Sequence, residues 1–179
     1  KKANAGFSAV KETWLELRGL FAHEFIFSSA AEEDGLPFER GVFEHLQAVN
    51  IIAGEDGVIT VDEAGADVLR YHAKIIQEYF ESYYIVLHTV LNQRVRKIGR
   101  KDFIADVRRV GVRLYHTGEV RLSESLSMPN YENAVRRLGD GGILVQKGAG
   151  SKNAEISTVD KDRALAMFDF VKTCLEVIA

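Results

Sequence analysis

The sequence predicts a mainly α-helical (α+β) chain with two small β-hairpins. Three observations support this fold class. Apolar residues recur every three or four positions over most of the chain, as they do on the buried face of an amphipathic helix. Two pairs of short β-rich runs flank glycine-containing turns. The order helix, helix, hairpin occurs in each half, so we expect two winged-helix-like units, 1–65 and 94–179, joined by a long central helix at 66–93.

The central helix is the strongest single prediction, because residues 66–93 contain neither glycine nor proline. An uninterrupted helix of this length would span about 42 Å. Its segment YYIVLHTVL, at 83–91, is apolar on nearly every side and should be enclosed by other elements. A membrane-spanning helix needs about 20 apolar residues. A buried core helix is therefore expected.

The first half should contain two helices and one hairpin. One amphipathic helix covers 8–27, and a second covers 37–49 after an acidic loop at 28–37. The hairpin joins 51–53 to 58–61. Asp62 then caps the next helix.

The second half repeats this plan after a basic run. We expect helices at 103–115 and 130–138, and a hairpin formed by 143–147 and 154–159. A glycine cluster at 139–142 follows the second of these helices, which indicates a helix stop and not a phosphate-binding loop. Asp160 opens the final helix.

A diverged internal duplication would explain this repetition. Phe43 aligns with Val135 and Leu46 with Leu138, 92 positions apart in both cases. After the hairpins the spacing becomes 98, which pairs Asp62 with Asp160 and predicts a second hairpin loop six residues longer than the first.

The composition of the chain limits the classes of function that it can have. The net charge of −3 provides no global attraction to nucleic acid. Cys174 is the single cysteine, which precludes an intrachain disulfide and fits a reducing compartment. The first residues contain no apolar targeting segment, and we expect Lys1 to lie at a domain boundary of a longer chain.

No catalytic, metal or cofactor signature is present. The five histidines lack metal-ligand spacing, and the nucleophile-elbow, P-loop and dinucleotide-binding motifs are missing. His72 and His88 are interpreted as structural, and His116 as complementing a helix dipole. We therefore expect no catalytic residue, no metal ligand and no cofactor in these 179 residues.

Two sets of residues are singled out as candidates. Glu81, Tyr83 and Tyr84 are predicted to organise the central helix. Glu78 and Glu81 share a helix face and could serve as an acid/base or metal pair, as a solvated face, or as a surface from which a buried Glu81 pairs with an arginine of the second half.

The second set is a basic run that could contact an anionic partner: Arg94, Arg96, Lys97, Arg100 and Lys101. Lipid headgroups, nucleic acid and an anionic substrate all fit its charge. The alternative is a solvated connector that pairs with the acids of the 28–37 loop. Nucleic acid is disfavoured because no aromatic side chains interleave with the cations to stack on bases.

Several segments carry a family resemblance: FESYYIV (80–86), GEVR (118–121), SESLSMP (123–129), YENAVRRL (131–138) and GGIL (141–144). Together they resemble the carboxyl-terminal region of the glycerol-3-phosphate/dihydroxyacetone-phosphate acyltransferases. These are membrane-associated enzymes that acylate the first position in phospholipid synthesis. In that family the chemistry lies upstream, in a domain marked by a histidine and an aspartate separated by four residues, a pattern that this sequence lacks.

The resemblance implies a non-catalytic accessory region that supports or docks an upstream catalytic domain of the same polypeptide. A cytoplasmic location, at the inner face of the membrane through the full-length protein, and contact with an anionic membrane surface follow as expectations. Two alternatives stay open. A winged-helix DNA-binding regulator would need more cations than Arg136 and Arg137 on its second recognition helix. The other alternative is a protein-interaction module.

Overall fold

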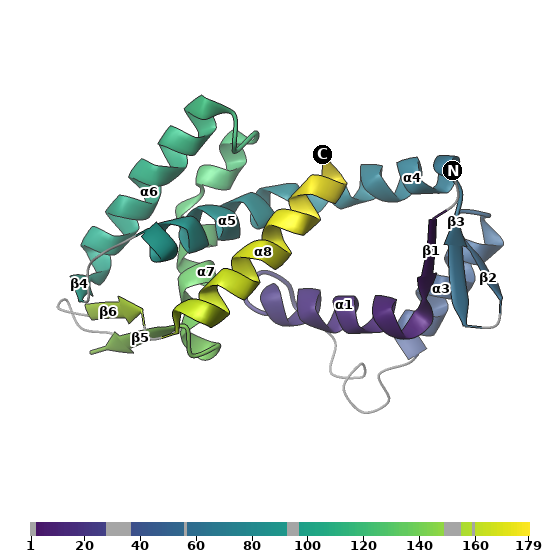
Figure 1. The fold of residues 1–179 in the computed structure, drawn as a ribbon, viewed down its shortest axis with the longest axis horizontal. Coiled ribbons are helices and arrows are strands. Elements are labelled where there is room, and N and C mark those ends of the chain that lie inside the picture. The colour runs from purple at the N-terminus through teal and green to yellow at the C-terminus, as the bar shows by residue number, and fades with distance from the viewer. Residues whose placement is uncertain (1–2, 28–36, 56, 93–96, 149–154, 159) are drawn as a thin grey trace. The chain divides into compact units, whose positions relative to one another are not determined.

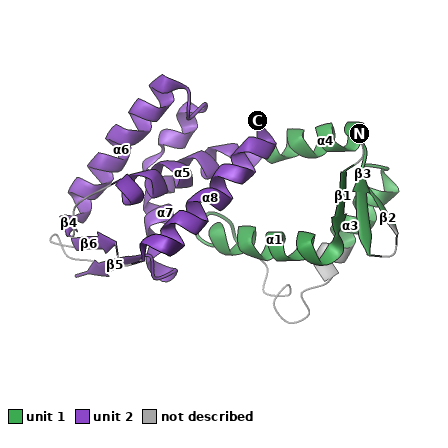
Figure 2. Cartoon of the chain, viewed as in Figure 1, with its two compact units in different colours: residues 1–73 green, residues 74–179 purple. Residues whose placement is uncertain are grey.

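The computed structural model describes residues 3–27, 37–55, 57–92, 97–148, 155–158 and 160–179. These residues form helices together with two three-stranded antiparallel sheets (Figure 1), which confirms the predicted fold class. The chain divides into two compact units, Lys1–Ala73 and Lys74–Ala179 (Figure 2). This division falls inside the stretch predicted as the connecting helix. The winged-helix comparison itself stays a prediction.

Unit 1 contains one small sheet and three described α-helices. In chain order these are β1 (Ala3–Gly6), α1 (Phe7–Leu20), α3 (Pro37–Ala48), β2 (Ala53–Glu55), β3 (Val58–Val61) and α4 (Glu63–Ala73). The sheet order is β1-β3-β2. The sequence pattern missed β1, because its residues ANAG carry no β-branched or aromatic side chain and all four are exposed. Its backbone pairing with β3 holds it in place.

The first predicted helix ends earlier than expected. It was predicted over 8–27, whereas α1 stops at Leu20. The N–H groups of both Glu24 and Phe25 donate to the carbonyl of Phe21, so the regular helical ladder ends there. The aromatic rings beyond it pack on one another instead, with Phe25 and Phe27 edge to face at 6.4 Å. Most of the predicted 28–37 loop lies outside the described residues.

Unit 2 repeats the plan of unit 1 with a further helix in front. Its elements are η1 (Lys74–Ile76), α5 (Gln77–Asn92), β4 (Ile98–Gly99), α6 (Arg100–Thr117), η2 (Ser123–Leu126), α7 (Met128–Asp140), β5 (Leu144–Lys147), β6 (Glu155–Thr158) and α8 (Lys161–Ile178). The sheet order β4-β6-β5 matches that of unit 1. Helix α5 packs against α6, α7 and α8. The core of unit 2 is therefore assembled around α5.

The predicted uninterrupted helix at 66–93 is wrong. A 3-10 turn, η1, separates α4 from α5. Ile75 in this turn is 68% exposed and Ile76 is partly exposed. The expected enclosure of the second segment is confirmed, because Tyr83, Ile85 and Leu87 are fully buried.

The sheet registers support the internal duplication. Gly6 pairs with Val58 in unit 1, and Gly99 pairs with Glu155 in unit 2. On the other side of these central strands, Glu55 of β2 pairs with Val58, and Lys147 of β5 pairs with Glu155. Residues 56–57 and 148–154 separate the paired strands, so the second hairpin loop is five residues longer, and not six as predicted.

The helix ends repeat as well. Asn50 and Gly142, 92 positions apart, both adopt left-handed backbone conformations, with φ of 58° and 70°. At each of these ends a backbone N–H reaches back to a leucine carbonyl, from Ile51 to Leu46 and from Ile143 to Leu138, at 2.9 Å in both cases. Left-handed residues of this kind end helices by satisfying their last carbonyls.

The predicted aspartate caps are also present in both units. Asp62 Oδ1 accepts a hydrogen bond from the backbone N–H of Gly65 at 2.8 Å. Asp160 Oδ1 accepts the equivalent bond from Arg163 at 2.9 Å. The two units therefore share strand order, helix ends and caps.

Candidate functional site

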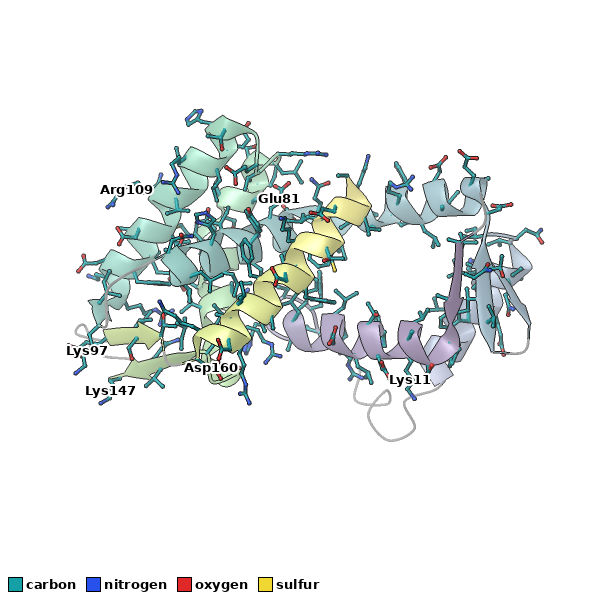
Figure 3. All side chains as sticks on the ribbon, viewed as in Figure 1. Lys11, Glu81, Lys97, Arg109, Lys147 and Asp160 are labelled. Carbon is teal, nitrogen blue, oxygen red and sulfur yellow. The ribbon has the colours of Figure 1, made fainter. Side chains whose placement is uncertain are left out.

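Among the described residues of unit 2, one buried polar arrangement is centred on the carboxylate of Glu81 on α5 (Figure 3), which is only 2% exposed. Its Oε1 accepts hydrogen bonds from Gln77 Nε2 at 2.8 Å and from the backbone N–H of Arg121 at 3.1 Å. Its Oε2 accepts from the backbone N–H of Leu122 at 3.0 Å and from Ser125 Oγ at 2.6 Å. Four donors thus occupy both oxygens, as a buried carboxylate requires.

This arrangement joins α5 to the segment between α6 and α7. The neighbouring Ser82 hydroxyl lies 2.9 Å from the carbonyl of Ser125 and 2.8 Å from that of Glu78. Asn130 Nδ2, from α7, lies 3.4 Å from Ser82 Oγ. Ser82, Ser125 and Asn130 are all buried, so these bonds form away from solvent, where each broken bond is costly.

The anticipated partner of Glu81 was an arginine of the second half. Arg121 does contact it, but through its backbone N–H, and the residue itself is exposed. No pairing of Glu81 with Glu78 is seen among the described side chains, since the donors to Glu81 come from other residues. Through its four hydrogen bonds, Glu81 joins α5 to the segment between α6 and α7. Its predicted role as an organiser of the central helix, with Tyr83 and Tyr84, stays a prediction.

Tyr84 and His88 form a half-buried cluster with Phe168 of α8. The Tyr84 and Phe168 rings stack with centroids 4.9 Å apart, and the Tyr84 hydroxyl donates to Glu119 Oε2 at 3.4 Å. Burial, followed by the charge of Glu119, raises the pKa of Tyr84. Burial, followed by the nearby Arg113 charge, lowers the pKa of His88. His88 therefore favours its neutral form, which fits its structural interpretation.

Tyr131 of α7 was not singled out by the sequence pattern. It is fully buried, and its hydroxyl has no hydrogen-bond partner among the described residues. Burial raises its pKa to about 12, against a smaller lowering by Arg108. The hydroxyl fits because the residue of α6 that faces it is Gly111. A Cβ added to Gly111 would lie 2.5 Å from the Tyr131 hydroxyl oxygen. Tyr131 is therefore a packing residue.

The basic run is only partly described. Arg94 and Arg96 lie outside the described residues. Lys97 and Lys101 are exposed, and Lys97 lies at the periphery of unit 2 (Figure 3). Arg100 is 32% exposed, with its guanidinium 3.9 Å from Glu132. Lys97 and Lys101 are thus the members of the run that the structure places in solvent.

The described residues contain no group of three or more histidine, cysteine, aspartate or glutamate side chains arranged to hold a metal ion. None of the helices in the described part of the chain is long and apolar enough to cross a membrane.

A family model described as the glycerol-3-phosphate acyltransferase C-terminal region matches residues 2–147. The chain belongs to this family. No curated protein gives a match.

Within the glycerol-3-phosphate acyltransferase C-terminal region, three of the five family-like segments meet at one place. Glu81 lies in FESYYIV, Arg121 in GEVR and Ser125 in SESLSMP, and all three take part in the same hydrogen-bond network. Sequence reasoning did not assign a role to Ser125 or Gln77. A signal was present for Gln77, because it lies four residues before Glu81 and therefore on the same helix face. Ser125 could be found only through the tertiary structure.

Proposed function

We propose that the chain is the non-catalytic accessory part of a glycerol-3-phosphate O-acyltransferase of phospholipid biosynthesis, and that it supports or docks a catalytic domain of the same polypeptide. The observation that carries this proposal is the family match over residues 2–147. The hydrogen bonds of Glu81 support the non-catalytic part of the proposal. A carboxylate that acts as a general acid or base must reach substrate, whereas this one is directed at four internal donors.

The test expresses this chain and the catalytic region of its acyltransferase as separate polypeptides. Each is assayed alone, and then together, for acylation of glycerol-3-phosphate by an acyl thioester. We expect the chain alone to transfer no acyl group, to co-purify with the catalytic region and to increase its activity or its half-life. Acyl transfer by the chain alone would contradict the non-catalytic part of the proposal, and failure to co-purify would contradict docking.

A second role, contact with an anionic membrane surface, is favoured by the exposed Lys97 and Lys101 next to the remainder of the basic run. Sedimentation with vesicles of phosphatidylglycerol, compared with phosphatidylcholine, tests it. Binding to the anionic vesicles should weaken in a Lys97→Glu/Lys101→Glu variant. Equal sedimentation of the variant and the wild type would contradict this role, and salt-sensitive binding of duplex DNA would favour the regulator alternative.

A further inference from the structure

Helix α6, at the outer edge of unit 2 (Figure 1), exposes a continuous row of side chains on one of its sides. The buried residues of α6 lie on its other side: Phe103, Ile104, Val107, Gly111 and Leu114. We call the exposed row the α6 strip: Lys101, Ala105, Arg108, Val112 and Tyr115. Its members follow one another at intervals of four, three, four and three positions, which places them along one side of an α-helix. The strip is therefore a single surface, about 21 Å long at 1.5 Å per residue.

The α6 strip is positively charged, although the chain as a whole has a net charge of −3. Among the described residues, no acidic side chain lies within ion-pair distance of Lys101 or Arg108. Arg109 and Arg113 flank the strip, and the Arg109 side chain is 78% exposed (Figure 3) although it lies 2.9 Å from Asp106. In all, α6 contains five arginines and lysines against two aspartates. This side of α6 therefore favours an anionic partner.

Apolar side chains are exposed between these cations. Val112 and Tyr115 are each 38% exposed, and Ala105 is exposed as well. A membrane surface accommodates both kinds of side chain, because anionic headgroups attract lysine and arginine while the interfacial region holds tyrosine rings and apolar groups. The phosphates of nucleic acid attract the cations but provide no apolar surface for Val112. The mixture of charged and apolar side chains thus favours a lipid surface.

The shape and size of the α6 strip favour a lipid surface over a folded partner protein as well. The outer side of a single helix is convex, whereas a helix that recognises a protein is commonly bound in a groove. Specific protein interfaces use about 20–30 residues a side, and the strip has five. A bilayer requires no groove, because the attraction of anionic lipids grows with each lysine or arginine near the surface.

We propose that the α6 strip is the surface through which the chain contacts an anionic membrane, with α6 lying parallel to the bilayer and Arg109 and Arg113 near the headgroups. The inference rests on the membrane role proposed above and specifies its contact surface. That surface shares Lys101 with the basic run and extends to Tyr115 at the other end of α6. The buried residues of α6 stay in the core of unit 2, so the contact is made at the headgroups and needs no insertion of the helix.

The first test measures sedimentation with vesicles of phosphatidylglycerol and phosphatidylcholine, compared with vesicles of phosphatidylcholine alone. Arg108→Glu alters the strip. Lys172→Glu on α8 is the control, because it changes the net charge equally and the Lys172 side chain is 56% exposed. We expect Arg108→Glu to bind the anionic vesicles about tenfold or more weakly than the wild type, and Lys172→Glu to bind them as the wild type does. Equal binding by the two variants would overturn the inference, whether both are unchanged or both are weakened.

The second test places a polarity-sensitive fluorophore on the α6 strip. Val112→Cys is labelled in a Cys174→Ser background, which removes the single native cysteine. Val145→Cys, on β5, is the control, because the two valines are 38% and 39% exposed. When anionic vesicles are added, we expect the emission of the label at Val112→Cys to shift to shorter wavelength and that at Val145→Cys to stay unchanged. A chain that binds the vesicles with no shift at Val112→Cys, or with equal shifts at both, would contradict contact through the strip.

The same measurements separate the α6 strip from the proposed function. A wild-type chain that does not bind the anionic vesicles overturns the membrane role itself. Binding that is lost in Lys97→Glu/Lys101→Glu and kept in Arg108→Glu overturns the strip and leaves the membrane role intact. Salt-sensitive binding of duplex DNA without vesicle binding would assign the cations to nucleic acid and overturn both. The accessory role is decided separately, by the acylation and co-purification assays.

Discussion

Ser125 Oγ lies 2.6 Å from Glu81 Oε2, and this bond links η2 to α5 across 44 positions of sequence. The same carboxylate accepts hydrogen bonds from two partly buried backbone N–H groups of the segment between α6 and α7. The backbone N–H groups of Arg121 and Leu122 therefore both donate to a single side chain.

Glu81→Gln should destabilise unit 2 by about 1–3 kcal/mol, because the new amide group directs N–H donors at groups that are themselves donors. Local opening should appear first at the segment held by Glu81. The measurement is amide hydrogen exchange, in which the N–H groups of Arg121 and Leu122 should exchange faster in the variant than in the wild type.

Glu78→Gln is the matched control, because Glu78 lies on the same helix and its carboxylate is absent from the network. It lies in the first turn of α5 and should lose only a dipole interaction of less than about 1 kcal/mol. Equal exchange in the two variants would show that Glu81 does not hold the segment.

Gly111→Ala should be destabilising by about 1–3 kcal/mol, because the added methyl group would lie 2.5 Å from the Tyr131 hydroxyl and 3.0 Å from Leu126 Cδ2. Tyr131→Phe should be close to neutral, since it removes a buried hydroxyl that has no partner among the described residues. Combining the two should recover part of the loss. Denaturant unfolding of the four proteins measures this coupling.

Gly139→Ala in α7 provides the comparison for a helical glycine with room beside it, because its Cβ would meet Gln146 Nε2 at an ordinary 3.5 Å. It should be neutral or slightly stabilising, as expected from the higher helix propensity of alanine. An equal loss in Gly111→Ala and Gly139→Ala would indicate a general helix effect and exclude the contact with Tyr131.

These residues show which parts of the structure were accessible from sequence. Asp62 and Asp160 were predictable because a cap acts on the residues immediately after it, and the hydrophobic spacing identified the helices for the same local reason. Strand β1 was missed because backbone pairing, and not side-chain propensity, forms it. The break at Lys74–Ile76 was missed because neither glycine nor proline marks it in the sequence.

The residues of the candidate site also divide into those that local sequence identifies and those that only the tertiary structure reveals. Glu81 was identified because a carboxylate within an apolar helix is locally conspicuous. Its partners could not be identified, because Arg121, Leu122 and Ser125 approach it from 40 or more positions away and two of them use only their backbone. Tyr131 was passed over since an apolar spacing alone does not show whether a tyrosine hydroxyl will find a partner.

Tyr131 should give an alkaline transition of its own. Its pKa is raised from 10.0 to about 12, so the stability that comes from keeping it neutral is fully present below pH 10 and is lost between pH 10 and about pH 12. Ultraviolet difference titration should show one tyrosine ionising near the upper end of this range. Tyr131→Phe should remove that component, and its survival in the variant would assign it to another tyrosine.

The charges around His88 predict opposite effects of two neighbouring substitutions. Burial is the first cause of its lowered pKa, the positive charge of Arg113 adds to the lowering, and Glu119 opposes it. His88 should therefore titrate below 6.5. Because the unfolded chain binds the proton more readily, this histidine contributes stability above pH 6.5 that is lost as the pH falls through its folded-state pKa.

Arg113→Gln should raise the pKa of His88, and Glu119→Gln should lower it further, as followed by proton NMR of the imidazole ring during an acid titration. The two variants act as controls for each other, since a structural disturbance of the Tyr84, His88 and Phe168 cluster would increase exposure and raise the pKa in both. Shifts of the His88 pKa in the same direction in both variants would therefore contradict the electrostatic account. Shifts in opposite directions would establish that the charges of Arg113 on α6 and of Glu119 after it affect the pKa of His88 on α5.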